Sequence, residues 1–350
     1  MPVTRNERKA WAREALRGVE NCTMPSFTAD FSELDEDGIR WDVQQAKAHG
    51  FFSTMCTCET GLTLAENKRF LEIVADEAAD DLLVSFTLLQ DSFEDSLELL
   101  AHAEKVGCSH ALLGYPQTFR PQSPDDIYDA TATLSEATNL GLVMYATDKF
   151  DFIRFHPSHV PFDAYDRIAD LPNVVAMKVG RVDPAMTFEA LRRFNDRVLV
   201  NVGTPWLMGL YPLLHREYGV QWFGGGSWEF WQSPEKPYVV EYHDLVMQGR
   251  YDEAMKLYFR LAPATGLAMR ESIGRGGDIG MYNWPLGKYV SWTVGGNGGL
   301  TREPAMRLAP QAMQMRKLAL RSIGIEPPAS DDDFYVGRAA YRRQHAGAAT

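Results

Sequence analysis

The sequence predicts a closed (β/α)8 barrel followed by additional C-terminal helices. Two observations lead to this fold class. Eight short apolar runs recur along the first 226 residues, and amphipathic stretches of a dozen or more residues lie between them. Strands that are apolar on both faces and alternate with helices form parallel sheets covered by helices. Eight such units are expected to close into a barrel, with a doubly wound open sheet as the alternative.

The eight candidate strands share apolar side chains with few interruptions. In chain order they are VENCTMPSF (19–27), FFSTMCT (51–57), LLVSFTLL (82–89), HALLGYP (110–116), LVMYAT (142–147), VVAMKVG (174–180), RVLVNVG (197–203) and VQWFGGG (220–226).

The helices between these runs are indicated by apolar residues at i, i+3, i+4 and i+7 and by capping residues. Residues 62–78 follow this spacing. So do residues 92–107, where Asp91 or Ser92 provides the N-cap and Gly107 the C-cap. A third helix is predicted over 123–141, which opens with Ser-Pro and closes with glycine.

After the eighth run the pattern becomes helical. Three further helices are predicted, and a glycine-rich, aromatic linker at 274–300 separates the second from the third. We expect the end of the chain to be loosely held. The resulting division is a barrel up to its eighth strand (1–228), the last barrel helix with a helical extension (229–328), and a charged tail (329–350).

Composition narrows the class of function. The 350-residue chain is 45% apolar and 23% charged, and its net charge of −12 disfavours nucleic acid or an anionic membrane as a partner. No apolar run is long enough to span a bilayer, and the N-terminus has no secretory pattern. Four cysteines without metal-site spacing indicate reduced, buried thiols and a cytoplasmic location.

Common cofactor motifs are absent from the sequence. The eight histidines form no HxH or HExxH cluster, and neither GxGxxG nor a P-loop occurs, so we expect no metal or nucleotide cofactor. The GGGSW segment at 224–228 is compatible with phosphate binding or with close backbone packing.

Lys178 is the strongest candidate for chemistry. It interrupts the apolar run VVAMKVG near its end, where the strands of a parallel barrel converge on one mouth. Burial of an amine favours its neutral form, which attacks carbonyl groups. The structural alternative is a lysine that reaches solvent or pairs with a carboxylate.

Three other polar positions lie near predicted strand ends. Tyr145, in LVMYAT on the preceding strand, is a candidate proton shuttle, although such tyrosines more often serve packing. Thr57 follows the second strand and can hold a carboxylate, with Cys58 and Thr60 in the same loop, or it can simply stabilise a turn. Asn283 can orient water or shape a turn.

These segments resemble the dihydrodipicolinate synthase / N-acetylneuraminate lyase family of class I aldolases over residues 20–325. Within the family, the chain looks most similar to hydratase-aldolases that cleave substituted benzylidene-pyruvates in aromatic catabolism. The resemblance implies a Schiff base on Lys178, proton transfer by Tyr145 and carboxylate binding by Thr57. It also places Asn283 in the hydration step and Trp222 or Phe223, beside Gly224, at the substrate pocket.

The sequence departs from the family pattern in three places. The threonine loop reads Cys-Thr-Cys-Glu-Thr (56–60), where the family has Gly-Thr-Thr-Gly-Glu. Tyr115 has no second tyrosine in register, which argues against the synthase branch. The segment between Tyr145 and Lys178 is long and is expected to add a pocket-lining loop, with Phe150, Phe152 and His156 as candidates.

The resulting hypothesis is a lyase that cleaves a 2-oxo acid to pyruvate and an aldehyde. An aromatic aldehyde is favoured by the resemblance and by five aromatic residues expected near the mouth: Trp206, Trp222, Phe223, Trp228 and Trp284. The resemblance implies no cofactor beyond the covalent Schiff base, and a homotetramer. Two alternatives remain, namely a sugar-acid aldolase, dehydratase or synthase-like enzyme, and a barrel that binds an oxo acid without turnover.

Overall fold

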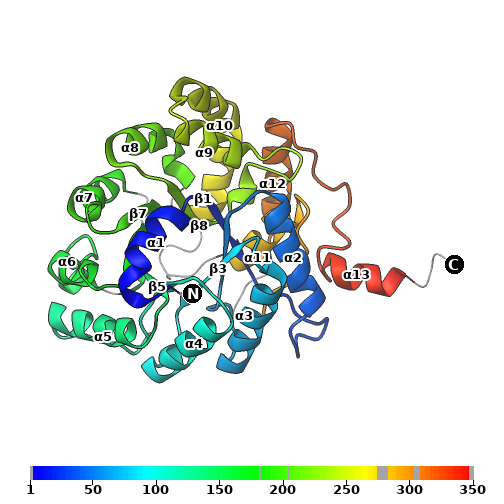
Figure 1. Cartoon of the computed structure of the whole chain (residues 1–350). Helices are drawn as coiled ribbons and strands as arrows, with labels where there is room; N and C mark the ends of the chain where they lie inside the picture. Colours follow the sequence, from blue (N-terminus) through cyan, green and yellow to red (C-terminus); the bar gives the residue numbers. More distant parts are fainter. Residues whose placement is uncertain are drawn as a thin grey trace.

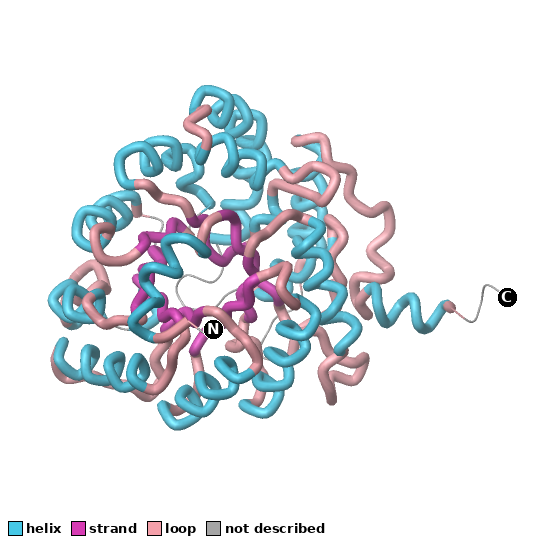
Figure 2. The backbone as a smooth tube through the Cα atoms, in the orientation of Figure 1, coloured by secondary structure: helices cyan, strands magenta, loops and turns pink. Residues whose placement is uncertain are grey.

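Eight parallel strands form a ring enclosed by helices in the computed structural model (Figures 1 and 2). The structure describes residues 3–150, 152–180, 183–203, 205–273, 283–302 and 308–346. Hydrogen-bonded neighbours follow the order β7-β6-β5-β4-β3-β2-β1-β8, so sequence neighbours are also spatial neighbours. The predicted (β/α)8 barrel is confirmed.

Each strand coincides with one of the eight predicted runs, except that β1 and β5 begin one residue before theirs. The strands are β1 (Gly18–Thr23), β2 (Ser53–Cys56), β3 (Leu83–Leu88), β4 (His110–Leu113), β5 (Gly141–Ala146), β6 (Val174–Val179), β7 (Leu199–Val202) and β8 (Trp222–Gly226).

Helices follow the strands and form the outer layer. The α-helices are α1 (Arg8–Ala15), α2 (Glu36–Ala48), α3 (Leu64–Ala78), α4 (Phe93–Lys105), α5 (Pro124–Glu136), α6 (Phe162–Ala169), α7 (Pro184–Phe194), α8 (Tyr211–Tyr218), α9 (Tyr238–Met247), α10 (Tyr251–Ile273), α11 (Trp284–Trp292), α12 (Pro310–Ser322) and α13 (Arg338–His345). Short 3-10 helices are η1 (Arg5–Glu7), η2 (Asp148–Phe150), η3 (Phe152–Arg154), η4 (Pro205–Leu210) and η5 (Trp228–Phe230). No helix in the described part of the chain has the length and apolarity needed to cross a membrane.

The predicted helix ends agree with the structure at the start of α4 and differ from it at the end of α5. Ser92 caps α4 as expected, since its side chain accepts a hydrogen bond from the Asp95 amide. The helix predicted over 123–141 was too long, because α5 ends at Glu136 and Gly141 begins β5. At Gly141 an added Cβ would lie 3.1 Å from Val175, so the glycine serves close packing between strands rather than a helix cap.

The C-terminal region is more ordered than expected. Part of the predicted linker forms α11, whereas residues 274–282 lie outside the described part of the chain. The tail contains α13, which is held to α2 and to the loop after α11. Arg343 forms an ion pair with Asp35 at 3.0 Å, and the Ala339 amide donates to Asn297 Oδ1 at 2.8 Å.

Helix α1 closes the amino-terminal end of the barrel. In Figures 1 and 2 it lies over the left part of the strand ring. Ala12 of this helix and Leu16, which follows it, are fully buried and pack into an interior cluster that includes Trp222 and Val175. The barrel therefore has an apolar floor, and polar groups of its interior can meet solvent only toward the opposite mouth.

Strands β7 and β8 are the two ends of the hydrogen-bonded strand order, and we call their line of contact the β7–β8 seam. Close packing at this seam depends on the absence of a side chain at Gly224. Asn201 on β7 is 1% exposed, and neither polar atom of its amide has a hydrogen-bond partner within the described residues. Its side chain lies so close to Gly224 that a Cβ there would overlap it. The GGG segment thus serves close packing, which was one of its two predicted roles.

A buried polar cluster joins the barrel to the C-terminal helices. The Asn21 amide donates to Glu229 Oε1 at 2.9 Å, and the guanidinium of Arg316 on α12 donates to the Glu229 backbone carbonyl at 2.7 Å. Burial raises the pKa of Glu229 to about 7, against the lowering effect of the Asn21 hydrogen bond. Its carboxyl group therefore favours the protonated state in the folded chain.

We predict that Gly224→Ala lowers the free energy of unfolding by about 1–3 kcal/mol or more, because the new methyl group overlaps the Asn201 amide. Denaturant unfolding measures the effect. Adding Asn201→Ala should restore part of the loss by making space. Gly266→Ala is the matched control, since nothing lies within 4 Å of its Cβ position. Equal stability of Gly224→Ala and wild type would contradict the packing argument.

We predict that Glu229 makes wild-type stability fall as pH rises from 4.5 toward 7, because the folded chain retains a proton that the unfolded chain has lost. The total effect is on the order of 3 kcal/mol. Glu229→Gln should lack this contribution, so its stability relative to wild type should increase over that pH interval. Parallel unfolding curves at several pH values test this, and a constant difference would contradict it.

Candidate active site

Lys178 lies on β6 and is buried, with 7% of its surface exposed. Its Nζ donates a hydrogen bond of 2.7 Å to the backbone carbonyl of Gly225 on β8. Gly203 lies beside the lysine stem, where an added Cβ would come within 2.7 Å of Lys178 Cε. The amine is therefore held inside the barrel by one backbone carbonyl of β8, and the absence of a side chain at Gly203 leaves room for the lysine stem.

Tyr145 is directly opposite Lys178 in the pairing of β5 with β6. The centre of its ring lies 5.6 Å from Lys178 Nζ, and the side chain is 5% exposed. Gly180 provides room for the ring, because a Cβ there would lie 2.6 Å from it. The structure thus brings together the two residues predicted to carry the chemistry.

Glu20 on β1 is a buried carboxylate that the sequence reasoning missed. Its Oε1 accepts hydrogen bonds from Ser53 at 3.0 Å, Ser85 at 2.7 Å and the His110 ring at 3.1 Å. Its Oε2 accepts from the Gly225 amide at 2.9 Å. An acid inside the apolar run VENCT was the same kind of indication that identified Lys178.

The surroundings of Glu20 favour its ionised form. Burial acts to raise its pKa, but hydrogen bonds from His110 and Ser85, together with the charges of His110 and Lys178, lower it overall. The side chain is 2% exposed, so solvent does not screen this charge. A fixed negative charge therefore lies one residue away from the Lys178 amine, on the other side of Gly225.

The threonine loop is partly occupied by its own hydrogen bonds. Thr57 is fully buried, and both its amide and its hydroxyl donate to the Thr23 carbonyl, at 3.1 and 3.3 Å. The Cys58 amide donates to the Thr87 hydroxyl at 2.9 Å. The Thr60 hydroxyl donates to the Thr57 carbonyl at 2.9 Å. A carboxylate held by Thr57 would require that hydroxyl to turn away from β1.

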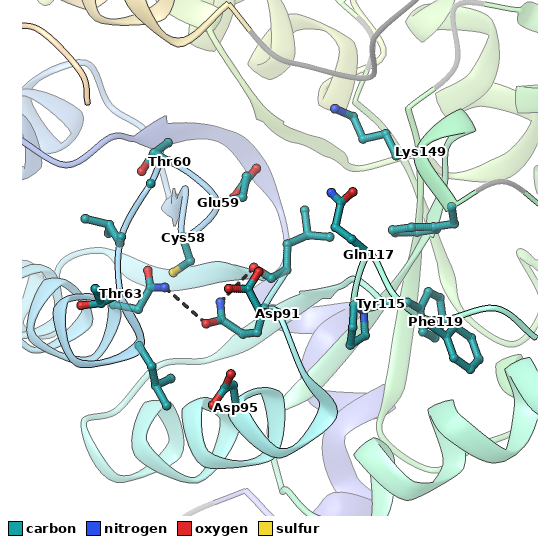
Figure 3. A pocket seen from close by; sticks show the side chains of 18 of the residues that line it. Cys58, Glu59, Thr60, Thr63, Asp91, Asp95, Tyr115, Gln117, Phe119 and Lys149 are labelled. Carbon is teal, nitrogen blue, oxygen red and sulfur yellow. Dashed lines mark hydrogen bonds between the residues drawn. The ribbon is translucent and has the colours of Figure 1, made fainter. Parts of the chain in front are cut away.

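A cavity of about 560 Å³ lies at the mouth, over the loops that follow β2 to β5. Cys58 and Thr60 line it, whereas Thr57, Tyr145 and Lys178 do not. In Figure 3 its polar side carries Thr60, Cys58 and Asp91, opposite a side formed by Tyr115, Gln117 and Phe119.

Aromatic rings connect this cavity to the Lys178–Tyr145 pair. Phe150 lines the cavity and also meets the Tyr145 ring edge-on, with ring centres 6.1 Å apart. Phe152 and Trp284 line the cavity as well. The expected pocket-lining role of the segment after β5 is thus met by Phe150 and Phe152. His156 instead packs against Phe162 and is absent from the cavity wall.

Two charged groups at the cavity have shifted pKa values. Burial raises the pKa of Glu59, although the Thr87 hydroxyl donates to its carboxylate and Lys149 and Lys178 oppose the shift. Burial lowers the pKa of Lys149 to about 8, and the charge of Lys178 acts in the same direction. Electrostatic coupling therefore links the cavity to the buried amine.

Several predicted site residues lie elsewhere. Asn283 is exposed and caps α11, where its side chain accepts a hydrogen bond from the Leu286 amide at 3.1 Å. This position matches the alternative prediction for Asn283, in which it shapes a turn. Trp222 points into the barrel near the floor, with its ring against His110 at 5.3 Å. Phe223 faces outward and packs on Tyr211 at 3.8 Å.

The remaining aromatic candidates include a core residue and a residue that lines the cavity. Trp228 is fully buried, and its indole donates to the Gly224 carbonyl at 2.9 Å, which is a core role. The side chain of Trp206, in η4, lies outside the described part of the structure. Gly224 lies at the β7–β8 seam. Of the five expected mouth aromatics, Trp284 lines the cavity.

The four cysteines are free, and Cys56, Cys58 and Cys108 are buried, as predicted for structural thiols. Burial raises the pKa of Cys58 well above its usual range, which disfavours a reactive thiolate at the cavity. Within the described ranges, no three His, Cys, Asp or Glu side chains are grouped as metal ligands would be.

Comparison with known proteins identifies distant relatives along most of the chain. No model of a known protein family matches it. The 4-hydroxy-tetrahydrodipicolinate synthase of Syntrophobacter fumaroxidans is 24% identical over 235 residues, which cover 66% of this chain and 76% of that protein. The corresponding synthase of Chlorobium phaeobacteroides is 23% identical over 318 residues, covering 90% of this chain and 99% of that protein.

Solved structures show the same fold. Dihydrodipicolinate synthase from Oceanobacillus iheyensis has a TM-score of 0.70 and 18% identity, covering 89% of this chain and 98% of that one. N-acetylneuraminate lyase from Fusobacterium nucleatum has a TM-score of 0.69 and 16% identity, covering 88% and 99%. This chain is therefore similar to 4-hydroxy-tetrahydrodipicolinate synthases along most of its length, and it shares its barrel fold with solved structures of a dihydrodipicolinate synthase and an N-acetylneuraminate lyase.

Proposed function

We propose that this protein is a Schiff-base-forming lyase that cleaves an aryl-substituted 2-oxo acid to pyruvate and an aldehyde. The pairing of Lys178 with Tyr145 in register on adjacent strands carries the proposal. A buried amine beside a phenol provides a nucleophile and a proton carrier within one site. Both lie where the strands of such barrels carry their catalytic groups.

The reaction follows from the chemistry of the amine. Neutral Lys178 attacks the 2-oxo carbon, the carbonyl oxygen takes up protons, and water leaves to give a cationic iminium. A base removes the proton of the hydroxyl on the carbon that becomes the aldehyde, the C–C bond breaks as that C=O bond forms, and the iminium accepts the electron pair to give an enamine. Protonation of the enamine and addition of water release pyruvate and regenerate the amine. Tyr145 is the proposed proton carrier in these steps.

The lining of the cavity supports an aryl group on the aldehyde half. Five aromatic residues contribute to it, namely Tyr115, Phe119, Phe150, Phe152 and Trp284. Such surfaces bind a ring through apolar contact and through edge-on or offset stacking. In the hydratase step proposed from the family resemblance, Asn283 would have to release its cap on the Leu286 amide before it could position the water that adds to the enone.

The polar side of the same cavity favours a second candidate. Asp91, Asp95 and Gln117 provide hydrogen-bond partners of the kind that a hydroxylated sugar acid requires. A sugar-acid aldolase, a dehydratase or a synthase-like reaction would use the same iminium on Lys178. A binder without turnover is the third possibility, and the homotetramer stays a prediction from the resemblance.

We predict that borohydride reduction with pyruvate labels Lys178, as read by peptide mass spectrometry, because its neutral amine forms the iminium. Lys178→Arg should abolish labelling. Lys149 is the rival amine at the mouth, since burial lowers its pKa to about 8. Label on Lys149, or none in wild type, would refute the proposed Schiff base. Labelling without release of pyruvate from any tested adduct would instead indicate a binder.

We predict that aryl-substituted pyruvate adducts are cleaved at least about tenfold faster, by kcat/KM, than polyhydroxylated 2-oxo acids. Removing one ring from the pocket should cost about 1–3 kcal/mol of discrimination. Phe119→Ala, which changes the wall but leaves Tyr145 and Lys178 in place, should therefore reduce that preference. Pyruvate release is the readout for both series. Faster cleavage of the polyhydroxylated acids would favour the second candidate.

A further inference from the structure

Glu20 and Lys178 bind opposite sides of one residue in the barrel wall. The Lys178 amine donates to the Gly225 carbonyl at 2.7 Å, and the Gly225 amide donates to Glu20 at 2.9 Å. A Cβ at Gly225 would lie 2.7 Å from Met55 Cε, so a side chain there would require the end of Met55 to move. Rotation of this residue would break one of the two bonds, so the position of the amine is tied to the carboxylate.

The carboxylate is itself fixed from three other strands. Ser53 on β2, Ser85 on β3 and His110 on β4 all donate to the Glu20 oxygen that faces away from Gly225. Hydrogen bonds of this number hold a buried carboxylate in its ionised form. The network therefore keeps a negative charge at a constant place near Lys178.

We propose that Glu20 is a positioning residue for Lys178, which holds the amine through Gly225 and stabilises the cationic iminium with its negative charge. This inference rests on the proposed function, since it requires an iminium on Lys178. It adds an acid for which neither the sequence reasoning nor the family resemblance had assigned a role.

The charge balance of the reaction explains why such an anion is useful. The neutral amine and the carbonyl take up one proton and release one water, so the nitrogen changes from uncharged to positive. A cation in a buried site is costly unless an opposite charge lies nearby. Glu20 provides that charge without bonding directly to the amine, so the nitrogen lone pair is free to react after it releases Gly225.

The other ionisable groups near Lys178 are less suited to this role. Cys22, Glu59 and Lys149 interact with it electrostatically, and His110 faces Glu20. Burial raises the pKa of Glu59, whereas that of Glu20 is lowered overall. The positive charge of Lys149 would repel a cationic iminium on Lys178. Glu20 is thus the carboxylate in this group that is held ionised.

Glu20→Gln tests the proposal, because it preserves shape and removes the charge. We expect the affinity for pyruvate, measured by borohydride trapping on Lys178, to fall about tenfold at alkaline pH, the size of a one-unit pKa change. The two proteins should converge at acid pH, where ammonium and iminium are both cations. The acid limb of trapping should move to lower pH, since an ammonium without its anion loses its proton more readily.

Glu20→Asp and a surface control complete the experiment. Glu20→Asp keeps the charge but is too short to retain every bond, so its loss should be smaller than that of Glu20→Gln. It also carries the test if Glu20→Gln does not fold. Glu98→Gln, on the exposed face of α4 where Glu98 pairs with Lys68, should behave as wild type. Circular dichroism establishes that each variant is folded.

The outcomes separate this inference from the proposed function. If wild type traps no pyruvate on Lys178, both are refuted. If wild type traps pyruvate and folded Glu20→Gln has the same affinity and pH profile, the inference about Glu20 alone is overturned. An equal loss in Glu20→Asp and Glu20→Gln at every pH would also overturn it, because a purely structural role has no dependence on charge.

Discussion

The interior of this barrel depends on one constraint, namely that charged side chains buried away from water must be compensated by nearby polar groups. Glu20 and Lys178 are both buried in a ring of apolar strands, and each ion would cost several kcal/mol if it stood alone there. The fold compensates them through Gly225, which offers its amide to the acid and its carbonyl to the amine. Ser53, Ser85 and the His110 ring complete the shell of Glu20, and their hydrogen bonds keep its carboxylate in one place.

The barrel is filled at its amino-terminal end, so the buried polar groups are approached from the opposite mouth. Helix α1 and Trp222 fill the amino-terminal end with apolar groups, so water and substrate can approach the polar layer only from the mouth. Above that layer, Phe150 touches both the Tyr145 ring and the cavity. The order from floor to mouth is therefore apolar packing, fixed charge, reactive amine and substrate space, which keeps the amine away from bulk solvent.

The sequence was sufficient for the features that local patterns determine. Eight apolar runs predict eight strands, and the consecutive strands of Tyr145 and Lys178 make their contact predictable. The Glu20 network could not be predicted in this way, because its donors come from β2, β3, β4 and β8. Trp222 and Phe223 are neighbours on β8, so their side chains face opposite sides of the barrel wall. Because the register of β8 could not be read from the sequence, the sequence did not show which of the two faces the interior.

The pKa values of two acids near the amine, Glu20 and Glu59, are shifted in opposite directions, and this difference suits the proposed chemistry. Glu20 remains ionised below the amine, whereas the raised pKa of Glu59 favours a protonated carboxyl at the mouth. A 2-oxo acid brings its own carboxylate, and a like charge close to Glu59 would raise that pKa further. Glu20 thus places negative charge beneath the iminium, whereas the cavity wall combines the cations of Lys149, Arg120, Arg154 and Arg302 with Asp91 and Asp95. Because Thr57 already donates to β1, these basic side chains of the cavity wall are the feature of the mouth that best accounts for admission of an anionic acid.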